Sequence, residues 1–476
     1  MTAWTTKISS QELAAQFLLP NWDKGVHWAP QQWPYAGYIF HQSDLENVAA
    51  TRTMLAAIYD SYRRANQPPP LLMVTEEGGV VHRFPGIAPP PSALLTSSLG
   101  ARTAYDVGRR IGQLLAMQGF NWNLAPVMDV YVPGNQVIGS RAFSDEAQQV
   151  AMIGKAWIRG HQAAGVPVTV KHFPGHGHAL DDSHRGLSQG KIEMVWEHDL
   201  LPFHAVLSEA PAVMTAHVQF SEFDQHPATV SIKWITGILR QRLHYKGIVV
   251  TDALAMGAIR ALYTPEDAAV RALQAGADLI DCGGHADLAA SVREAVAWAI
   301  DHHILPSHIL TTAQRRVRRW RQLIRSPDLW PAVDELPELE KEFRQWVFRG
   351  SSVVRGNPRD FSIALPQIWI AAKRPTQIRE GRIPHKPVLY QPLNTPKLLE
   401  TLDQISSHAV IVYTDNLWQS KKTAEIVKRF CQHRKVLHVA VTDPLDAELL
   451  PEASATIAVR GNPFYAVDVV RSLLRT

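Results

Sequence analysis

The sequence predicts an α/β protein, namely a (β/α)8 barrel of the TIM type followed by a smaller α/β domain. Short apolar runs alternate with helical patterns over about the first 330 residues, and several runs are hydrophobic throughout, as parallel strands covered on both faces are. The alternation restarts from about residue 358. We therefore expect residues 1–350 to form the barrel and residues 351–476 to form a sandwich-like α/β domain.

Eight strands are expected in the first domain, which is the number that closes such a barrel. In order, they are Ala15–Leu19, Tyr35–Phe40, Leu71–Thr75, Asn121–Pro126, Val166–His172, Ala212–His217, Gly247–Asp252 and Ala277–Cys282. Helical patterns between them include Asp44–Asn66, Thr103–Gln118, Asp145–Ala164 and Pro265–Ala275. An open doubly wound sheet is the alternative, because a strand count taken from sequence is uncertain by one or two.

The second domain is expected to alternate strands and helices in the same way. Its strands are Ile368–Ala372, Val388–Tyr390, Ala409–Tyr413, Val436–Val441 and Thr456–Val459, and its helices are Leu398–Ser406, Ser420–His433 and Pro463–Arg475. Before it, the basic stretch Thr311–Arg325 and the acidic stretch Asp334–Glu342 are interpreted as solvated helix faces. Nothing in this domain indicates chemistry.

The composition excludes several classes of protein. The 476 residues include 48 Lys and Arg against 44 Asp and Glu, so the chain lacks the basic excess of a nucleic-acid-binding protein. The two cysteines exclude a disulfide framework and a Cys-rich zinc site. The longest apolar runs are only as long as strands, and residues 1–7 do not resemble a secretory signal. We expect a cytoplasmic protein without a membrane or nucleic-acid partner.

Polar side chains gather where the expected strands end. They include the Glu76-Glu77-Gly78-Gly79 segment, Asp129, the Lys171-His172 pair, His217 and Asp252. A barrel builds its active site from this end of its strands. The pattern therefore predicts a site at the carboxyl-terminal rim.

Two features of this rim indicate acid–base and nucleophilic chemistry. Asp182 and His184 lie two residues apart in a glycine-punctuated loop, so the carboxylate can fix the imidazole tautomer and raise its basicity. Asp252 follows the buried run Gly247–Val250, which places a single carboxylate where it can act as a nucleophile. The alternative for Asp252 is a helix N-cap.

A metal-dependent barrel hydrolase is a further alternative. Its ligands would be the His176-x-His178 pair with Asp252 and His217. The two histidines follow Pro174 in a loop, whereas a rigid metal site usually places such a pair on a strand. We expect no metal and no cofactor.

At this point the sequence resembles family 3 glycoside hydrolases, in particular their bacterial β-N-acetylglucosaminidase branch in its two-domain form. The matching blocks occur in the family's order over roughly residues 12–300. They are Leu71–Phe84, Asn123–Val130, Ile138–Phe143, Lys171–His184, Val213–His217, Pro227–Ser231 and Ile248–Gly257. The Lys-His-Phe-Pro-Gly-His-Gly block with its Asp-Ser-His continuation is highly specific to that branch.

The resemblance implies a retaining mechanism in two steps. Asp252 would attack the anomeric carbon, and His184, oriented by Asp182, would protonate the leaving oxygen and then deprotonate water. The substrate would be a terminal N-acetylglucosamine on peptidoglycan fragments or chito-oligosaccharides, with phosphorolysis as a variant of the second step. The positions that would hold the sugar are Arg83, Arg141, Lys171 and His172.

One departure from the family pattern concerns sugar recognition. The family motif begins Asp-x-Glu-Gly-Gly, but Thr75 stands at the position of the Asp, and Val80 replaces a residue that is often basic. A threonine cannot accept two sugar hydroxyls in charged hydrogen bonds. Either Glu76 substitutes for the missing acceptor, or the preferred sugar differs. A sugar-binding protein without activity is the remaining alternative.

Overall fold

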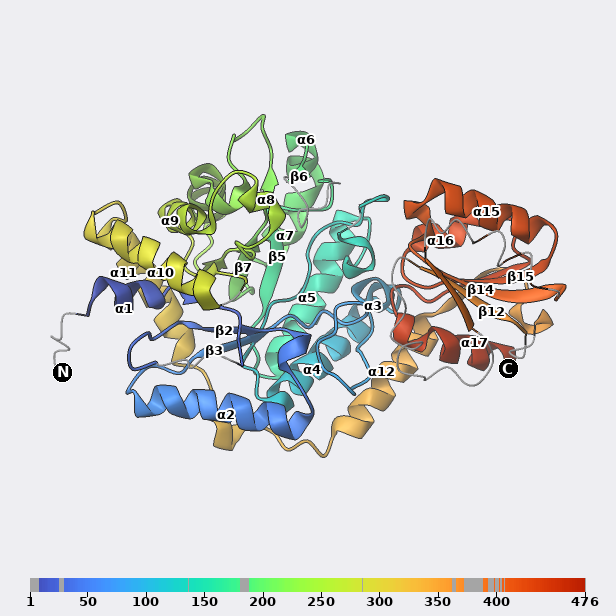
Figure 1. Ribbon diagram of the computed structural model, residues 1–476, viewed down its shortest axis with the longest axis horizontal. Helices are drawn as coiled ribbons and strands as arrows, with labels where there is room; N and C mark the ends of the chain where they lie inside the picture. Colours follow the sequence, from blue (N-terminus) through green and yellow to red (C-terminus); the bar gives the residue numbers. More distant parts are fainter. Residues whose placement is uncertain are drawn as a thin grey trace.

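The computed structural model describes residues 8–24, 30–135, 137–179, 188–284, 286–361, 365–371, 388–392, 398, 402, 405 and 407–475. Figure 1 shows an N-terminal region, coloured blue to yellow, beside an orange and red C-terminal region. Helix α12 (Leu336–Gly350) leads from one to the other. The domain boundary between residues 350 and 351 remains a prediction. Among the described residues, no helix combines the length and the apolarity that crossing a bilayer requires.

The strands of the N-terminal region overlap the eight expected runs. They are β1 (Leu18–Leu19), β2 (Gly37–Phe40), β3 (Leu71–Val74), β4 (Trp122–Asn123), β5 (Thr169–Phe173), β7 (Ala212–Thr215), β9 (Ile248–Val250) and β10 (Ile280–Asp281). All pair in parallel, as their unbroken apolar character predicts. A further short sheet, β6 (Ser188–Gln189) with β8 (Val218–Gln219), was not predicted.

These strands form three separate parallel sheets, ordered β1-β10, β2-β3-β4 and β5-β7-β9. Isolated parallel bridges join their edges, from Asn21 to Ile39, from Asn123 to Val168, from Val127 to Lys171 and from Val250 to Leu279. No one of the three described sheets is closed by its own strand pairing. A parallel α/β architecture is therefore confirmed, whereas the closed barrel stays a prediction.

Helices cover these strands. They are α1 (Ser10–Ala15), α2 (Val48–Arg64), α3 (Ala93–Ser98), α4 (Gly100–Gln118), α5 (Ala147–Ala163), α6 (Ile192–Met194), α7 (Leu200–Val206), α8 (Gly257–Arg260), α9 (Pro265–Ala275), α10 (Ala286–Asp301) and α11 (Ser307–Arg321). Local signals explain where several begin: Asn47 caps α2, and Thr264 caps α9 ahead of Pro265. The predicted strand at Ala15 starts late, because Ser9 and Glu12 form a capping box that keeps α1 helical.

The basic stretch Thr311–Arg325 differs from its interpretation as a solvated face. Arg321 on α11 is buried and donates hydrogen bonds to the carbonyl oxygens of Pro68 and Pro69, at 2.6 and 2.7 Å. Arg316 forms an ion pair of 2.8 Å with the buried Asp278. These two cations therefore attach the helix to the amino-terminal side of the strands.

The C-terminal region contains one six-stranded sheet in the order β11-β16-β15-β14-β12-β13. Its strands are β11 (Ser352–Arg355), β12 (Gln367–Ala371), β13 (Val388–Pro392), β14 (Ala409–Asp415), β15 (Lys435–Ala440) and β16 (Ala455–Ala458). Only the unpredicted β11 runs antiparallel, so the sheet is mixed. The helices α15 (Lys421–Gln432), α16 (Pro444–Leu449) and α17 (Ala466–Arg475) accompany it. Most of the expected helix Leu398–Ser406 lies outside the described residues.

Candidate active site

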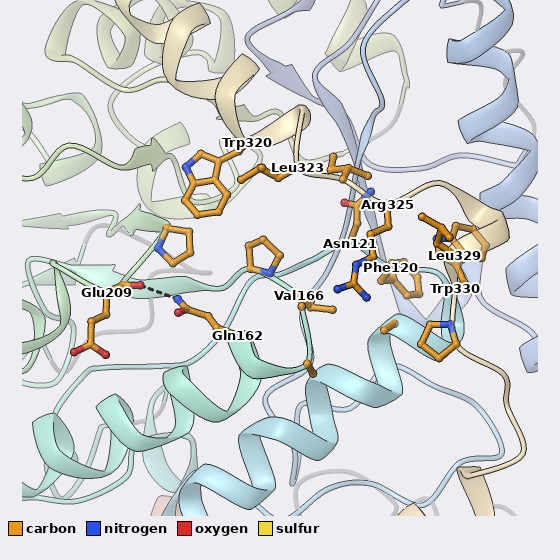
Figure 2. Close-up of a pocket in the computed structure, with 17 residues that line it drawn as sticks. Phe120, Asn121, Gln162, Val166, Glu209, Trp320, Leu323, Arg325, Leu329 and Trp330 are labelled. Carbon is orange, nitrogen blue, oxygen red and sulfur yellow. Dashed lines mark hydrogen bonds between the residues drawn. The ribbon is translucent and has the colours of Figure 1, made fainter.

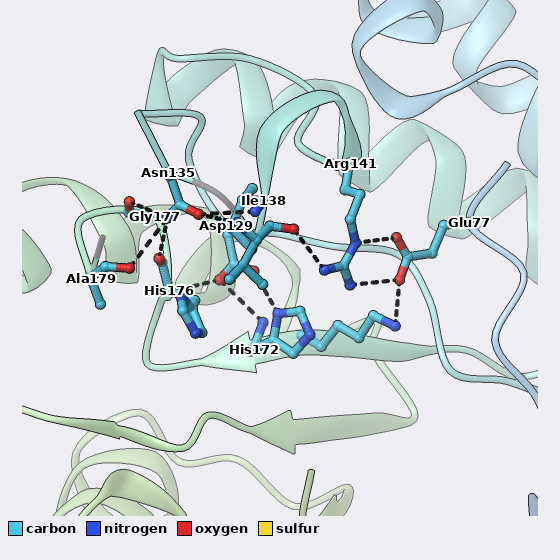
Figure 3. Close-up of polar contacts among 11 residues, drawn as sticks. Glu77, Asp129, Asn135, Ile138, Arg141, His172, His176, Gly177 and Ala179 are labelled. Atoms are coloured by element: carbon cyan, nitrogen blue, oxygen red, sulfur yellow. Dashed lines mark hydrogen bonds and ion pairs between the residues drawn. The ribbon is translucent and has the colours of Figure 1, made fainter. Parts of the chain in front are cut away.

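A buried carboxylate, Glu77, joins two cations that come from distant parts of the chain (Figure 3). The Arg141 guanidinium binds it in a bidentate manner, with Nε 2.7 Å from Oε2 and Nη2 2.9 Å from Oε1. The Lys171 Nζ lies 2.6 Å from Oε1. Lys171 belongs to β5, at the point where its pairing register with β7 shifts, and Arg141 ends a short 3-10 helix, Gly139–Arg141. The structure thus brings together two predicted sugar-binding residues.

The charges in this cluster support one another. Burial alone would raise the pKa of Glu77, but Arg141 and Lys171 hold it well below its usual range. Burial lowers the pKa of Lys171, although the negative charge of Glu77 acts in the opposite direction and raises it. Two cations share one carboxylate, so the cluster presents net positive charge to a ligand.

The loop after β3 depends on its glycine pair. Gly78 and Gly79 have φ angles of +81° and +58°. A Cβ at Gly78 would lie 2.3 Å from the Pro91 carbonyl oxygen, and one at Gly79 would lie 2.6 Å from the Ser92 Cβ. Side chains are therefore excluded at both positions, and the tight turn brings Glu77 to the rim.

The neighbouring Glu76 has a different environment. It is fully buried, and its carboxylate accepts hydrogen bonds from the Gly78 and Arg83 backbone N–H groups and from His82 Nδ1, at 3.0 to 3.1 Å. The Asn123 side chain accepts from the Glu76 N–H and donates to its carbonyl oxygen, both at 3.0 Å. This geometry favours a structural role for Glu76 over contact with a sugar.

The other predicted residues of this loop do not join the Glu77 cluster in the contacts described. Thr75 follows β3 directly and is partly exposed. Burial and the Arg83 charge together lower the pKa of His41, which places the Arg83 guanidinium near that histidine. Their proposed contacts with sugar remain expectations.

A second acid–base pair lies beside the Glu77 cluster. The Asp129 Oδ2 accepts a hydrogen bond from His172 Nδ1 at 2.6 Å, and Oδ1 accepts from the His176 N–H at 2.8 Å (Figure 3). Burial opposes ionisation of Asp129, but the His172 charge and hydrogen bond lower its pKa. The proton of His172 is thereby held on Nδ1, which leaves Nε2 to face a ligand. The sequence placed Asp129 at the rim without giving it this partner.

Asn135 holds the start of the histidine-rich loop. Its Nδ2 donates to the carbonyl oxygens of His176, Gly177 and Ala179, at 2.9, 2.8 and 3.3 Å. Its Oδ1 accepts from the backbone N–H groups of residues 137 and 138. The loop continues into residues 180–187. Asp182 and His184 therefore lie outside the described residues.

The two histidines of the metal alternative contact different carboxylates. His178 Nδ1 lies 2.9 Å from the Asp199 Oδ1, whereas His176 donates its backbone N–H to Asp129. The hydrogen bond to Asp199 raises the pKa of His178. In the described part of the chain, no three His, Cys, Asp or Glu side chains converge as a metal site would need.

Asp252 lies just beyond β9 and is partly exposed. Its Oδ1 accepts a hydrogen bond from the Ala253 N–H at 2.8 Å. Burial opposes its charge, yet His217, His172 and Lys171 hold the pKa of Asp252 below its ordinary value. The next helix, α8, starts at Gly257 with Met256 as its N-cap, so the N-cap interpretation of Asp252 is wrong. The charges of these three side chains therefore favour the ionised form of Asp252.

Sequence reasoning missed a second carboxylate at this rim. Asp281 ends β10, is 5% exposed, and accepts a hydrogen bond from the Gly283 N–H at 2.9 Å. Burial and the charge of Asp252 raise the pKa of Asp281 to about 8. The only signal for it was its position near the end of an expected strand.

A cavity of about 300 Å³ lies at the opposite, amino-terminal side of the strands (Figure 2). Trp320 and Trp330 line it, and Asn121 lies just before β4 there. Its carboxylate, Glu209, forms ion pairs with Arg159 at 2.7 Å and Lys155 at 3.1 Å. Glu209 is therefore already paired with two cations, and we assign the active site to the carboxyl-terminal rim of the strands.

Fold and site together define an α/β enzyme whose polar machinery gathers at the carboxyl ends of parallel strands. The chain belongs to glycosyl hydrolase family 3, because the model of the family's N-terminal domain matches residues 33–320. It is thus a glycoside hydrolase.

Individual relatives agree with this assignment. A β-hexosaminidase from Xylella fastidiosa is 37% identical over 242 residues, which are 48% of this chain and 72% of that protein. One from Photobacterium profundum is 32% identical over 304 residues, which are 62% of this chain and 88% of that protein. The structure of a family 3 β-N-acetylglucosaminidase from a Paenibacillus species superposes with a TM-score of 0.84 at 26% identity, covering 98% of this chain and 96% of that one.

Proposed function

We propose that this protein is a retaining exo-β-glycosidase that removes terminal N-acetylglucosamine from peptidoglycan fragments or chito-oligosaccharides. The observation that carries the proposal is the position of Asp252 just beyond the end of β9, where the charges of His217, His172 and Lys171 lower the pKa of its carboxyl group. Relatives described as β-hexosaminidases and a β-N-acetylglucosaminidase support the choice of sugar.

The proposed reaction has two steps. An Asp252 oxygen attacks the anomeric carbon and forms a glycosyl ester, while His184 gives a proton to the departing oxygen. His184, oriented by Asp182, then takes a proton from water, and the resulting hydroxide displaces Asp252 from the sugar. The Lys171 and Arg141 cations and the Nε2 of His172 supply hydrogen-bond donors or acceptors for the sugar hydroxyls.

The proposal includes the closed (β/α)8 barrel and its C-terminal partner domain. The isolated parallel bridges between the edges of the three sheets support closure, because they join the sheets in the order that a barrel requires. We also propose a cytoplasmic location, which the two free, buried cysteines support.

Turnover of p-nitrophenyl β-N-acetylglucosaminide, within a panel of other β-glycosides, tests the proposed activity. The wild type should release p-nitrophenol, and Asp252→Ala should lose this release by several orders of magnitude, because no covalent intermediate can form. The control is Asp267→Ala, which removes a carboxylate exposed on α9 and paired with Arg271. Product analysis with and without phosphate separates hydrolysis from phosphorolysis.

The residue that forms the covalent bond to the sugar can be identified directly. A fluorinated N-acetylglucosaminyl donor should label the peptide that contains Asp252, as mass spectrometry would show. A label on Asp281 instead would overturn the assignment of the nucleophile. Calorimetric sugar binding without turnover of any glycoside would show a binding protein and overturn the proposed activity.

A further inference from the structure

A second cavity, of about 180 Å³, lies between the two regions of the molecule. Gly139, Ser140 and Arg141 line it from the N-terminal region. The carboxyl ends of β14 and β15 line it from the C-terminal region, through the segments 415–418 and 442–443. Ligands bind at such strand ends in open parallel sheets. The cavity therefore lies where side chains that follow β14 and β15 can contact a ligand.

Two carboxylates line this cavity. Asp415 ends β14, and Asp443 follows β15 and is 3% exposed. The Asp443 Oδ1 accepts hydrogen bonds from the Tyr131 hydroxyl and the Leu445 N–H, both at 2.9 Å. Its Oδ2 lies 3.7 Å from where a Cβ on Gly139 would stand, on the side of the Arg141 loop. Burial raises the pKa of both carboxyl groups.

One buried hydroxyl in this cavity is left for a ligand to satisfy. The Ser140 hydroxyl, on a residue only 2% exposed, has no hydrogen-bond partner of good geometry among the described residues, whereas the Thr442 hydroxyl interacts with the Asp415 carboxyl group. Trp418 adds an aromatic ring to the lining. The backbone at this position is held by the Asp446 carboxylate, which accepts hydrogen bonds from the Leu417 and Trp418 N–H groups. A buried hydroxyl without a partner is costly, and the Asp415 and Asp443 carboxyl groups lie in the same lining, so a ligand rich in hydroxyl and amide groups fits this cavity.

The cavity adjoins the candidate active site at Arg141. Arg141 lines the cavity and also forms an ion pair with Glu77. Burial lowers the pKa of Arg141, but the charges of Glu77, Asp129 and Asp252 raise it. A saccharide with its terminal ring at Asp252 would therefore extend past Arg141 toward Asp443.

We propose that this cavity binds the leaving-group sugar, that it takes a neutral N-acetylglucosamine ring, and that it disfavours a ring bearing a carboxylate. This inference rests on the proposed glycosidase function and narrows its substrates to chito-oligosaccharides. Asp415 and Asp443 accept hydrogen bonds from hydroxyl or amide groups, whereas a carboxylate, such as that of N-acetylmuramic acid, would stand next to two acids. The exposed Val80 at the cavity edge offers no cation, and the Arg141 guanidinium in the lining is already paired with Glu77.

Three substrates with the same terminal sugar test the inference: the p-nitrophenyl glycoside, chitobiose, and the disaccharide of N-acetylglucosamine on N-acetylmuramic acid. In the wild type, kcat/KM should be higher for chitobiose than for the acidic disaccharide. Asp415→Ala should lower the ratio of kcat/KM for chitobiose to that for the p-nitrophenyl glycoside about tenfold, the loss expected for one charged hydrogen bond. Thr442→Val is a second variant, expected to lower the same ratio.

The control is Asp468→Asn, which removes a charge from α17 that pairs with Arg344, and it should leave all three values unchanged. A wild type that prefers the acidic disaccharide, or an unchanged ratio in folded Asp415→Ala and Thr442→Val, overturns the inference while the glycosidase function stands. If no glycoside is turned over, the proposed function fails instead.

In that case calorimetric binding of chitobiose tests the inference. Chitobiose should bind the wild type about tenfold more tightly than Asp415→Ala, and equal or absent binding overturns the inference.

Discussion

At the scale of single residues, the two adjacent glutamates of the rim have opposite environments. Glu76 is buried against His82 and the backbone of its own loop, whereas Glu77 neutralises Arg141 and Lys171. Neighbouring side chains on an extended backbone point to opposite sides, so one faces the interior of the loop and the other faces the site. The side that faces the site is decided by the turn at Gly78 and Gly79.

Glu77→Gln tests the role of this carboxylate. Lys171 and Arg141 would keep their burial but lose their counter-charge, so we expect the free energy of unfolding to fall by about 3–5 kcal/mol. The KM for the p-nitrophenyl glycoside should also rise. Denaturant unfolding and steady-state kinetics measure both. Glu76→Gln is the matched control: it should destabilise the protein through His82 and leave KM within about twofold. An equal rise of KM in both variants would contradict the assignment.

Asp281→Asn tests the buried carboxylic acid beside Asp252. The unfolded chain releases this proton near pH 3.9, whereas the folded protein keeps it until about pH 8. The unfolded state therefore binds fewer protons between these values, and stability falls as the pH rises through them. Asparagine cannot ionise, so the variant should gain in melting temperature relative to the wild type at pH 8 more than at pH 5. A constant difference at the two pH values would show that Asp281 is ionised in the folded state.

At the scale of elements, the connection after β4 organises the connection after β5. The side chain of Asn135 takes up three carbonyl groups of the segment from His176 to Ala179. That segment leads directly toward Asp182 and His184. One side chain thus determines where the proposed acid–base loop departs from the strand.

Asn135→Ala should therefore lower kcat by more than its stability loss explains. We expect about 1–3 kcal/mol of destabilisation from the buried groups left unpaired. Asn121→Ala is a close control. The Asn121 side chain also accepts a hydrogen bond from a backbone N–H group, that of Leu72, and donates one to a carbonyl group, that of Pro70, but it lies on the amino-terminal side of the strands. It should lose stability and keep its kcat. If both variants keep kcat, Asn135 does not position the loop.

At the scale of the whole molecule, the C-terminal region supports the loop that carries Glu77. The Ser92 N–H donates to the Asn462 Oδ1 at 3.0 Å, and the Tyr465 hydroxyl donates to the Pro89 carbonyl at 3.0 Å. Between these two positions, the Pro90 carbonyl accepts the Gly79 N–H at 2.8 Å. Ala88 and Leu95 complete an apolar cluster that belongs mainly to the C-terminal sheet and its helices. The second region therefore stabilises the site as well as lining its edge.

Asn462→Ala tests this support. It removes the bonds to Ser92 and to the carbonyl groups of Val459 and Arg460, so stability should fall by about 1–3 kcal/mol. The KM should rise because the turn at Gly79 loosens. Asn357→Ala, which removes a surface cap of a short 3-10 helix in the same region, should leave KM unchanged. An unchanged KM in Asn462→Ala would show that the two regions are coupled in stability alone.

The sequence by itself determined where the strands lie, because an unbroken apolar run has no stable place except between covering layers. It also predicted that Lys171, His172 and Asp252 lie at one rim, since parallel strands deliver their carboxyl ends to one side, whereas Arg141 was expected from the family resemblance alone. Tertiary structure alone decided the burial of Arg321, the different contacts of Glu76 and Glu77, the raised pKa of Asp281 and the cavity that Asp443 lines. Each of these depends on contacts between segments far apart in the chain, and no local pattern records such contacts.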